Sequence, residues 1–336
     1  MPAADSIEPI VFFGTPDFAV PTLAALVAAG QAPALVVTQP SRPVGRGRQA
    51  QAPPVARWAH EHGLAVAQPE RVRAEEFLAM LRALAPQSPG IAVVVAFGQI
   101  FPRELLALPR FGCINLHASL LPRWRGAAPI QAAVAAGEER TGVTTMQMEA
   151  GLDSGPVLLQ EEVAIGAAET AGELSVRLAE TGAALMVRTL AELARGALAP
   201  RVQDASLATY APRLTRDSGR ADWSLPAKTL SDRLRAYSPW PGLTAELSGA
   251  PVKLVRARPL TPDPVSPPSP GGREGMGEGG RGGEGSFLGL RGDALAVACG
   301  GGSVLGVEEL QRPGRKPSRA ADFANGERLR AGDRFS

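Results

Sequence analysis

A histidine and an asparagine stand two residues apart in CINLHASLLPRWRGAAPI, residues 113–130. Asn115 and His117 alternate there with the apolar Ile114 and Leu116. Because side chains two apart in a β-strand point to the same face, we expect the amide and the imidazole to project together. Both groups can donate a hydrogen bond to an oxygen on which negative charge develops. The spacing alone leaves open that they instead satisfy backbone groups in the core.

An aspartate in a turn is a candidate partner for this histidine. Asp153 lies in EAGLDSGPV, residues 149–157, with Gly151 and Gly155 two residues to either side. Glycines allow a tight turn and a close approach to a ligand or another strand. If the carboxylate reached His117, the pair could carry a proton near neutral pH. The alternative is an ordinary turn aspartate.

A third feature is a basic stretch, TQPSRPVGRGRQAQAPP, residues 38–54, which contains Arg42, Arg46 and Arg48. No acidic residue occurs between Asp17 and Glu61, so these arginines have no acidic neighbour along the chain. Arginines on a loop interrupted by proline and glycine suit contact with nucleic-acid phosphates. A solvated basic loop is the alternative.

Other chemical signals are weak. The strand-to-helix turn FFGTPDFAV, residues 12–20, lacks the G-x-G-x-x-G pattern of a dinucleotide site. His60 and His62 have no partner at metal-ligand spacing, and Cys113 and Cys299 are too far apart in sequence for a cysteine-rich metal site or disulfide framework. We therefore predict no metal site and a reduced, cytoplasmic protein. No segment approaches the roughly 18 apolar residues of a membrane span.

Short apolar runs alternate with helical segments through the first half of the chain. The strands are expected at 9–13, 34–38, 91–97 and 112–117, and the helices at 18–29, 53–62 and 74–85. This alternation predicts an α/β fold with a mostly parallel, Rossmann-like sheet. Ligands of such sheets bind beyond the carboxyl ends of the strands, where Asn115 and His117 would lie.

The pattern changes in the second half. Two more strands are expected at 142–148 and 156–165, and a helix after the capping box TAGE ends at 195–196. We therefore predict a catalytic domain at 1–196, a linker at 197–212 and a second domain at 213–336. In that domain, a helix at 226–236 and short strands at 242–248, 251–259, 287–291, 294–299 and 304–311 predict a small OB-like β-barrel. A Pro- and Gly-rich insert at 261–286 has little to bury and is expected to be disordered.

Composition supports a globular protein that meets an anionic partner through its second domain. Hydrophobic residues make up 45% of the chain and charged residues 20%, with a net charge of +2. Residues 1–208 carry 16 Lys and Arg against 19 Asp and Glu, whereas residues 209–336 carry 19 against 14. A mildly basic second domain is compatible with RNA.

The motifs together resemble the methionyl-tRNA formyltransferase family over almost the whole chain except the insert. The similarity lies in VFFGTPDFA, VVTQPSRPVGRGR, VVVAFGQI, GCINLHASLLPRWRGAAPIQ, TGVTTMQMEAGLDSGPV, DWSLPA and YSPWPG. It implies transfer of a formyl group from 10-formyltetrahydrofolate to the amino group of methionine on initiator methionyl-tRNA, by direct attack through a tetrahedral intermediate and without a metal. Ser41 and Phe101 depart from the usual residues of the family.

The resemblance also assigns roles to single residues. It implies that Asn115, His117 and Asp153 are catalytic, that two segments contact the folate, and that the arginine loop and the barrel contact tRNA. The folate segments are Ser119, Leu120, Leu121 and Pro122, and Phe97, Gly98, Gln99 and Ile100. The tRNA-contacting residues of the loop are Arg42, Arg46 and Arg48, and a monomer is expected.

Rival functions share the same trio. A folate-dependent formyltransferase acting on an amino sugar nucleotide or on glycinamide ribonucleotide would also use Asn115, His117 and Asp153, and so would a hydrolase of formyl-folate. A non-catalytic RNA-binding protein on the same scaffold is a further alternative. The arginine loop and the second domain favour a tRNA substrate.

Overall fold

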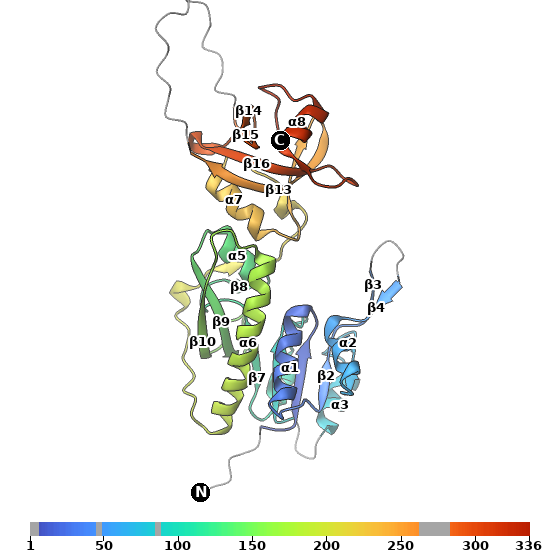
Figure 1. Cartoon of the computed structure of the whole chain (residues 1–336). Coiled ribbons are helices and arrows are strands. Elements are labelled where there is room, and N and C mark those ends of the chain that lie inside the picture. Colours follow the sequence, from blue (N-terminus) through green and yellow to red (C-terminus); the bar gives the residue numbers. More distant parts are fainter. Residues whose placement is uncertain (1–6, 45–48, 85–88, 262–282) are drawn as a thin grey trace, which may run out of the picture. The chain divides into compact units, whose positions relative to one another are not determined.

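The computed structural model describes residues 7–44, 49–84, 89–261 and 283–336 (Figure 1). Two compact units divide the chain: unit 1 comprises 1–130, 139–166 and 173–212, and unit 2 comprises 131–138, 167–172 and 213–336. Arg46, Arg48 and residues 262–282 of the predicted insert lie outside the described residues. The described end of that insert belongs to the folded unit, because Gly285 and Ser286 are buried.

Unit 1 is built on a seven-stranded sheet with the strand order β10-β9-β7-β6-β1-β2-β5. The parallel strands are β1 (Ile10–Gly14), β2 (Leu35–Val37), β5 (Val66–Ala67), β6 (Ile91–Val95) and β7 (Cys113–His117). At one edge β9 (Arg140–Gln147) and β10 (Val157–Ala164) run antiparallel. The mostly parallel sheet expected from the apolar runs is confirmed.

Helices cover this sheet and bury its strands. They are η1 (Asp17–Ala19), α1 (Val20–Ala28), α2 (Pro54–Glu61), α3 (Glu75–Ala83), α4 (Arg103–Ala107) and α6 (Ala171–Ala194), whereas most of α5 (Pro129–Ala135) belongs to unit 2. Every residue of β1 and β6 is buried, as expected for strands covered on both faces. Strand β7 lies between β6 and β9, so its carboxyl end opens near the middle of the sheet.

The arginine stretch forms a hairpin where the sequence predicted only a loop. Strands β3 (Arg42–Val44) and β4 (Gln49–Gln51) pair antiparallel, with Arg42 opposite Gln51. These strands pair with no other described strand, so their pairing is a local feature. The prolines and glycines of this stretch favoured a loop prediction. The hairpin projects from unit 1 between β2 and α2 (Figure 1).

The predicted linker is part of unit 1. Residues 197–212 contain η2 (Ala205–Leu207) and β11 (Tyr210–Ala211), and β11 pairs in parallel with β8 (Arg125–Gly126). Arg201 forms an antiparallel bridge with Val157 at the start of β10. The 201–211 segment is thus bonded to the sheet edge and to the chain that follows β7.

Unit 2 is an antiparallel sheet with two helices. Its elements are η3 (Asp217–Gly219), α7 (Ala227–Ala236), β12 (Leu243–Leu247), β13 (Ala250–Leu260), β14 (Phe287–Arg291), β15 (Ala294–Ala298), η4 (Gly300–Gly302), β16 (Val304–Gln311), β17 (Ser318–Arg319) and α8 (Ala320–Glu327). The strand order is β12-β13-β16-β15-β14, with β17 paired to β16.

The C-terminal residues join the two edges of this sheet. Ser336 exchanges two backbone hydrogen bonds with Glu246 of β12, at 2.7 and 2.9 Å. Phe335 N donates to Gly285 O at 2.8 Å, just before β14. The open path of strands is therefore closed by the chain terminus, which gives the barrel-like arrangement expected for this domain.

Candidate functional site

Strand β7 carries the asparagine and the histidine to its carboxyl end. Asn115 lies opposite Met146 and His117 opposite Thr144 across the antiparallel pair with β9. His117 is buried, with 6% of its surface exposed, and Asn115 is half-buried. Both side chains fall on the same face of β7, as the alternation predicted.

The turn after β9 brings Asp153 to His117. Oδ2 of Asp153 lies 3.7 Å from Nδ1 of His117. The same oxygen accepts a hydrogen bond from Gly126 N at 2.7 Å. The approach inferred from the two separate motifs therefore exists, and a main-chain N–H steadies the carboxylate in it.

The second ring nitrogen of His117 contacts a main-chain carbonyl oxygen. Nε2 of His117 lies 2.9 Å from Trp124 O. Because a carbonyl can only accept, Nε2 carries a proton in this contact. Nδ1 faces the Asp153 carboxylate at 3.7 Å, which is longer than a hydrogen bond. Trp124 O and Asp153 together fix the orientation of the ring.

The chain at 124–126 reaches both partners through an unusual backbone. Trp124 has φ of 57° and Gly126 has φ of 116°, both in the left-handed half of conformational space. A Cβ at Gly126 would lie 2.6 Å from Ala211 O. Glycine is therefore needed at 126 for close packing against β11 and for the N–H that reaches Asp153.

Among Asn115, His117 and Asp153, it is Asn115 whose polar side chain stays available for a ligand. Within the described ranges its side chain makes no hydrogen bond, whereas His117 and Asp153 each have partners. A half-buried amide with open donors can bind a ligand oxygen. Asn115 is thus the better placed of the two predicted donors in this arrangement.

The segment after β7 holds itself together through its polar groups. Ser119 is fully buried, and its hydroxyl donates to Arg123 O at 2.6 Å. Leu121 is also buried and packs in a cluster with Met146 and Val157. Of the four predicted folate residues here, only Leu120 and Pro122 have partly exposed side chains. Ser119 and Leu121 therefore pack inside the protein, and Ser119 O, Leu121 N and Leu121 O already bond to the side chains of Thr144 and Gln160.

In the turn after β6, the aromatic ring of Phe97 packs in the core and its carbonyl oxygen bonds to neighbouring side chains. Phe97 is buried and packs edge-on against Phe13 and Phe101, with ring centroids 5.3 and 6.0 Å away. Phe97 O accepts hydrogen bonds from Thr15 Oγ1 at 3.0 Å and from Gln39 Nε2 at 3.1 Å.

The three residues that follow differ in what they offer a ligand. Gln99 Oε1 accepts from Val72 N at 2.9 Å, so this amide holds the neighbouring loop. Gly98 is exposed with φ of 89°, and Ile100 is 93% exposed. Gly98 and Ile100 are therefore the members of the predicted FGQI wall that a ligand can reach.

Cys113 shares the strand face of Asn115 and is buried at 1% exposure. Burial raises the pKa of its thiol to about 12. Because the thiolate is the nucleophilic form, Cys113 is a packing residue.

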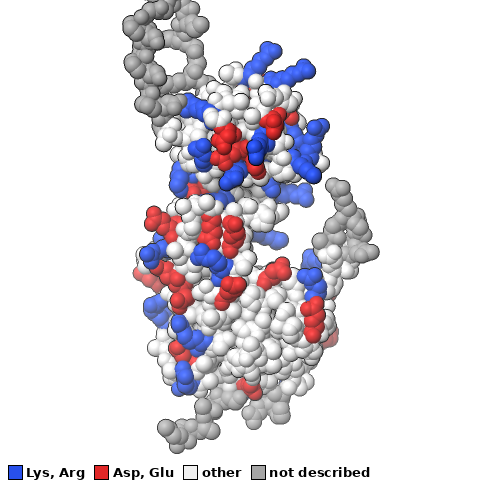
Figure 2. Space-filling model, viewed as in Figure 1, with Lys and Arg blue, Asp and Glu red and all other residues white. Residues whose placement is uncertain are grey.

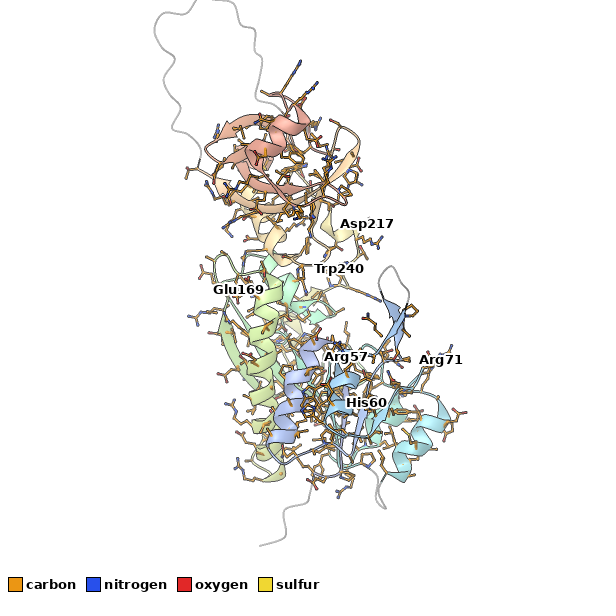
Figure 3. The ribbon with its side chains drawn as sticks, turned by 45° about the vertical axis from the view of Figure 1, so that its right-hand side comes forward. Arg57, His60, Arg71, Glu169, Asp217 and Trp240 are labelled. Carbon is orange, nitrogen blue, oxygen red and sulfur yellow. The ribbon has the colours of Figure 1, made fainter. Side chains whose placement is uncertain are left out.

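Unit 1 carries exposed arginines on β3, on α2 and after β5. Arg42 is exposed on β3, and Figure 3 labels the exposed Arg57 on α2 and Arg71 after β5. None of the three makes an ion pair with a described residue. His60, also on α2, is exposed, as expected.

Unit 2 also displays cations. Figure 2 shows Lys and Arg side chains over the barrel-like sheet. Several that flank α8 are exposed and have no ion pair to a described residue, namely Arg315, Lys316, Arg319, Arg328, Arg330 and Arg334. This distribution agrees with the positive charge of the second half of the sequence.

Several residues of the site escaped the sequence analysis. Trp124, Arg125 and Gly126 stand in the quoted motif, but only the folded chain shows that the first and last contact His117 and Asp153. Gln203 lies in the predicted linker, yet its amide donates to Asp153 O at 2.9 Å. No sequence spacing links position 203 to position 153.

The described residues hold neither a metal-binding cluster nor a membrane-spanning helix. No group of three His, Cys, Asp or Glu side chains that could hold a metal ion is found there. No helix in the described ranges is long and apolar enough to cross a membrane.

Family comparisons match both halves of the chain. The formyl transferase family matches residues 8–190, and the family described as formyl transferase, C-terminal domain, matches residues 213–328. The chain is 48% identical over 324 residues to the methionyl-tRNA formyltransferase of Halorhodospira halophila, covering 96% of this chain and 98% of that protein. It is 43% identical over 323 residues to the methionyl-tRNA formyltransferase of Citrifermentans bemidjiense, covering 96% and 95%.

Solved structures share the fold at low identity. WlaRD, a sugar 3N-formyl transferase, superposes with a TM-score of 0.62 at 14% identity, covering 93% of this chain and 100% of its own. HypX from Aquifex aeolicus, solved with tetrahydrofolic acid, gives a TM-score of 0.58 at 16% identity, covering 95% of this chain and 47% of its own. These similarities concern the fold alone.

Proposed function

The chain belongs to the formyl transferase family, and we propose that it formylates the amino group of methionine on initiator methionyl-tRNA, with 10-formyltetrahydrofolate as donor. The His117–Asp153 pair and the unpaired Asn115 amide at the carboxyl end of β7 support formyl transfer. The observation that favours methionyl-tRNA over other acceptors is the similarity to relatives named methionyl-tRNA formyltransferase. Relatives named methionyl-tRNA formyltransferase align with 96% of the chain.

Exposed groups near the carboxyl ends of β6 and β7 fit a folate donor. Leu120 and Pro122 are partly exposed after β7, and Ile100 is almost fully exposed after β6. An apolar ring can pack on such side chains, while backbone groups bind its polar edge. Gly98 leaves room for a close approach to the main chain. The donor supplies a formyl carbon whose oxygen gains negative charge when an amine attacks.

Asn115 stabilises that charge. Its half-buried Nδ2 is free to donate to an oxygen placed over the end of β7. A preorganised donor of this kind contributes roughly 2.7–4 kcal/mol to an acyl-transfer step. His117 can add a second hydrogen bond only by exchanging its contact with Trp124 O or Asp153.

His117 and Asp153 handle the proton of the attacking amine. A new bond joins the methionine nitrogen to the formyl carbon, the bond from that carbon to the donor nitrogen breaks, and one proton must move from amine to donor. Asp153 orients the imidazole and can accept the proton of the amine through water, from which the proton passes to the donor nitrogen. Such acid–base assistance accounts for about 10²–10⁴-fold in rate.

The tRNA meets exposed cations. Arg42, Arg57 and Arg71 offer guanidinium groups on unit 1, and the basic residues flanking α8 offer more on unit 2. Arginine binds phosphate oxygens with two parallel hydrogen bonds. We assign Arg42 and its neighbours to the acceptor end and the cations of unit 2 to a second stretch of the tRNA backbone.

The test is a formylation assay with pure protein. The protein is incubated with 10-formyltetrahydrofolate and either initiator or elongator methionyl-tRNA, and formyl-methionine is detected directly. Product with initiator tRNA is expected. Absence of product, together with formylation of an amino sugar nucleotide, would move the chain to the sugar-nucleotide alternative. Release of formate without any acceptor would identify a hydrolase.

A further inference from the structure

Gln203 touches the main chain of the Asp153 turn, and we propose that it is a positioning residue for the formyl transfer. Its side-chain amide holds the turn in the conformation that directs the Asp153 carboxylate to His117. The kinetic consequences of this proposal rest on the proposed function. Its geometric part concerns only the position of the Asp153 carboxylate relative to His117.

The amide nitrogen of Gln203 fastens the turn at two points. Nε2 donates to Asp153 O at 2.9 Å and to Gly155 O at 2.7 Å. Asp153 has φ of 47°, a left-handed conformation that a non-glycine residue keeps only where its surroundings hold it. A Cβ at Gly155 would lie 1.8 Å from Gln147 O, so the turn is also pressed against the end of β9. One side chain thus restrains both carbonyls of a strained turn.

The amide oxygen of Gln203 is held in turn by Arg125. Nε and Nη2 of Arg125 donate to Oε1 at 3.1 and 2.8 Å. Arg125 is only 6% exposed, and it forms no ion pair in the described part of the chain. Burying a guanidinium that has no carboxylate partner costs free energy. Because Arg125 directs two hydrogen bonds to the Gln203 amide, this amide is its specific partner.

Arg125 also lies next to the residue that binds the carboxylate. Gly126 N donates to Asp153 Oδ2, so the chain at 125–126 touches Asp153 directly and again through Gln203. Strand β8 therefore holds both parts of Asp153. Gly126 N binds its carboxylate, and Arg125 holds its main chain through Gln203. A shift of Gln203 would tilt the carboxylate relative to His117.

The 201–211 segment that carries Gln203 is anchored on both sides of it. Arg201 and Val157 exchange two backbone hydrogen bonds of 2.8 Å. Thr209 Oγ1 accepts from Trp124 N at 2.8 Å, and Thr209 O accepts from Arg125 N at 2.8 Å. These anchors fix the position from which the Gln203 side chain reaches the turn.

Only an amide of this length meets both requirements. Gln203→Glu keeps an acceptor for Arg125 but loses the N–H donors that bind two carbonyls. Gln203→Met keeps the length and loses both functions. Val202→Ala is the matched control, since Val202 is the preceding residue and is 82% exposed.

The first experiment measures formylation kinetics and thermal unfolding for these variants. Since a small misplacement can cost about 10²-fold in rate, Gln203→Met and Gln203→Glu should lower kcat about 10- to 100-fold while KM for both substrates stays unchanged. Val202→Ala should keep the kcat of the unaltered protein. A folded Gln203→Glu variant with unaltered kcat would overturn the proposal.

A double-mutant cycle separates positioning from general destabilisation. In an Asp153→Asn background, Gln203→Met should cause little further loss of kcat, because the group that it positions is already disabled. Losses that multiply would show that Gln203 acts independently of Asp153, and they would refute the positioning role.

A second readout does not depend on turnover. The chain has three histidines, so a protein labelled with ¹⁵N-histidine gives few ring signals, and His117→Gln assigns one of them. The His117 ring shifts should change in Gln203→Met and not in Val202→Ala. Unchanged shifts would overturn the geometric claim. If the shifts respond but the unaltered protein makes no formyl-methionine, the positioning stands and the proposed function fails.

Discussion

Oδ2 of Asp153 lies 3.7 Å from Nδ1 of His117, and main-chain groups bind both side chains in this arrangement. Gly126 N holds the carboxylate and Trp124 O holds the far nitrogen of the ring. Both contacts come from one short stretch of backbone after β7. The protein therefore sets the ring and the carboxylate relative to each other before any substrate binds, which is the form that preorganised acid–base catalysis takes.

The first prediction concerns Asp153. Asp153→Asn preserves the size of the side chain but removes the charge that faces Nδ1, so proton transfer from the amine should slow. We expect kcat to fall about 10²–10⁴-fold with little change in KM for tRNA. Single-turnover formylation measures the loss, and the thermal midpoint serves as the folding control. A variant within twofold of the unaltered rate, about 0.4 kcal/mol, would remove Asp153 from the mechanism.

The second prediction concerns Asn115. Asn115→Ala deletes the unpaired donor over the end of β7, so the charge on the formyl oxygen loses its partner. The expected loss in kcat is about 10²–10³-fold. Cys113→Ala is the matched control, because Cys113 lies on the same strand face and its raised pKa keeps the thiol neutral. Equal losses in both variants would indicate a packing effect instead.

A third prediction tests the close packing at Gly126. In Gly126→Ala the new Cβ meets Ala211 O at 2.6 Å and the backbone keeps φ of 116° only under strain. The free energy of unfolding should fall by about 1–3 kcal/mol, and kcat should fall because the N–H leaves Asp153. Gly196→Ala, with φ of 63° and open space around it, should cost about 1 kcal/mol and leave kcat unchanged. A Gly126→Ala variant as active as Gly196→Ala would contradict the role of this N–H.

The sequence predicted the strands well because burial on both faces leaves continuous apolar runs. β1, β6 and β7 fall within one or two residues of the expected ranges. It also singled out Asn115 and His117, whose polar side chains interrupt an apolar run, and it offered Asp153 as a partner against the alternative of an ordinary turn aspartate. The approach of Asp153 to His117 was a hypothesis from chemistry, and the structure places the two side chains 3.7 Å apart.

The supporting contacts could not be predicted in the same way. Trp124 and Gln203 act through backbone and amide groups, whose partners are set by how distant segments pack. The left-handed conformation of Trp124 has no signature in residue type, because among residues other than glycine only asparagine, aspartate and histidine are enriched there. The β3–β4 hairpin was concealed for a related reason, since only two short strands support it.

A fourth prediction tests the hairpin as a tRNA contact. Arg42→Ala removes an exposed guanidinium that has no acidic partner among the described residues. The expected result is weaker tRNA binding and a smaller slope of log affinity against log salt, by roughly one unit per lost phosphate contact. KM for folate should stay the same. Arg82→Ala is the control, because Arg82 lies on α3 and pairs with Glu75 at 2.6 Å. A loss confined to folate use would contradict the assignment.

The last prediction concerns the pH dependence of unit 2. Hydrogen bonds from Arg312 lower the pKa of Glu327 from its ordinary value of 4.5. The two bonds, of 3.0 and 2.7 Å, tie α8 to the end of β16. A carboxyl whose pKa is depressed on folding stabilises the native state above the unfolded value and loses that effect as the pH falls through the folded one. Urea unfolding should therefore show Glu327→Gln less stable at pH 7, with the difference vanishing below the folded pKa. Because deprotonation is complete at neutral pH, a difference that grew between pH 7 and pH 4 would refute this linkage.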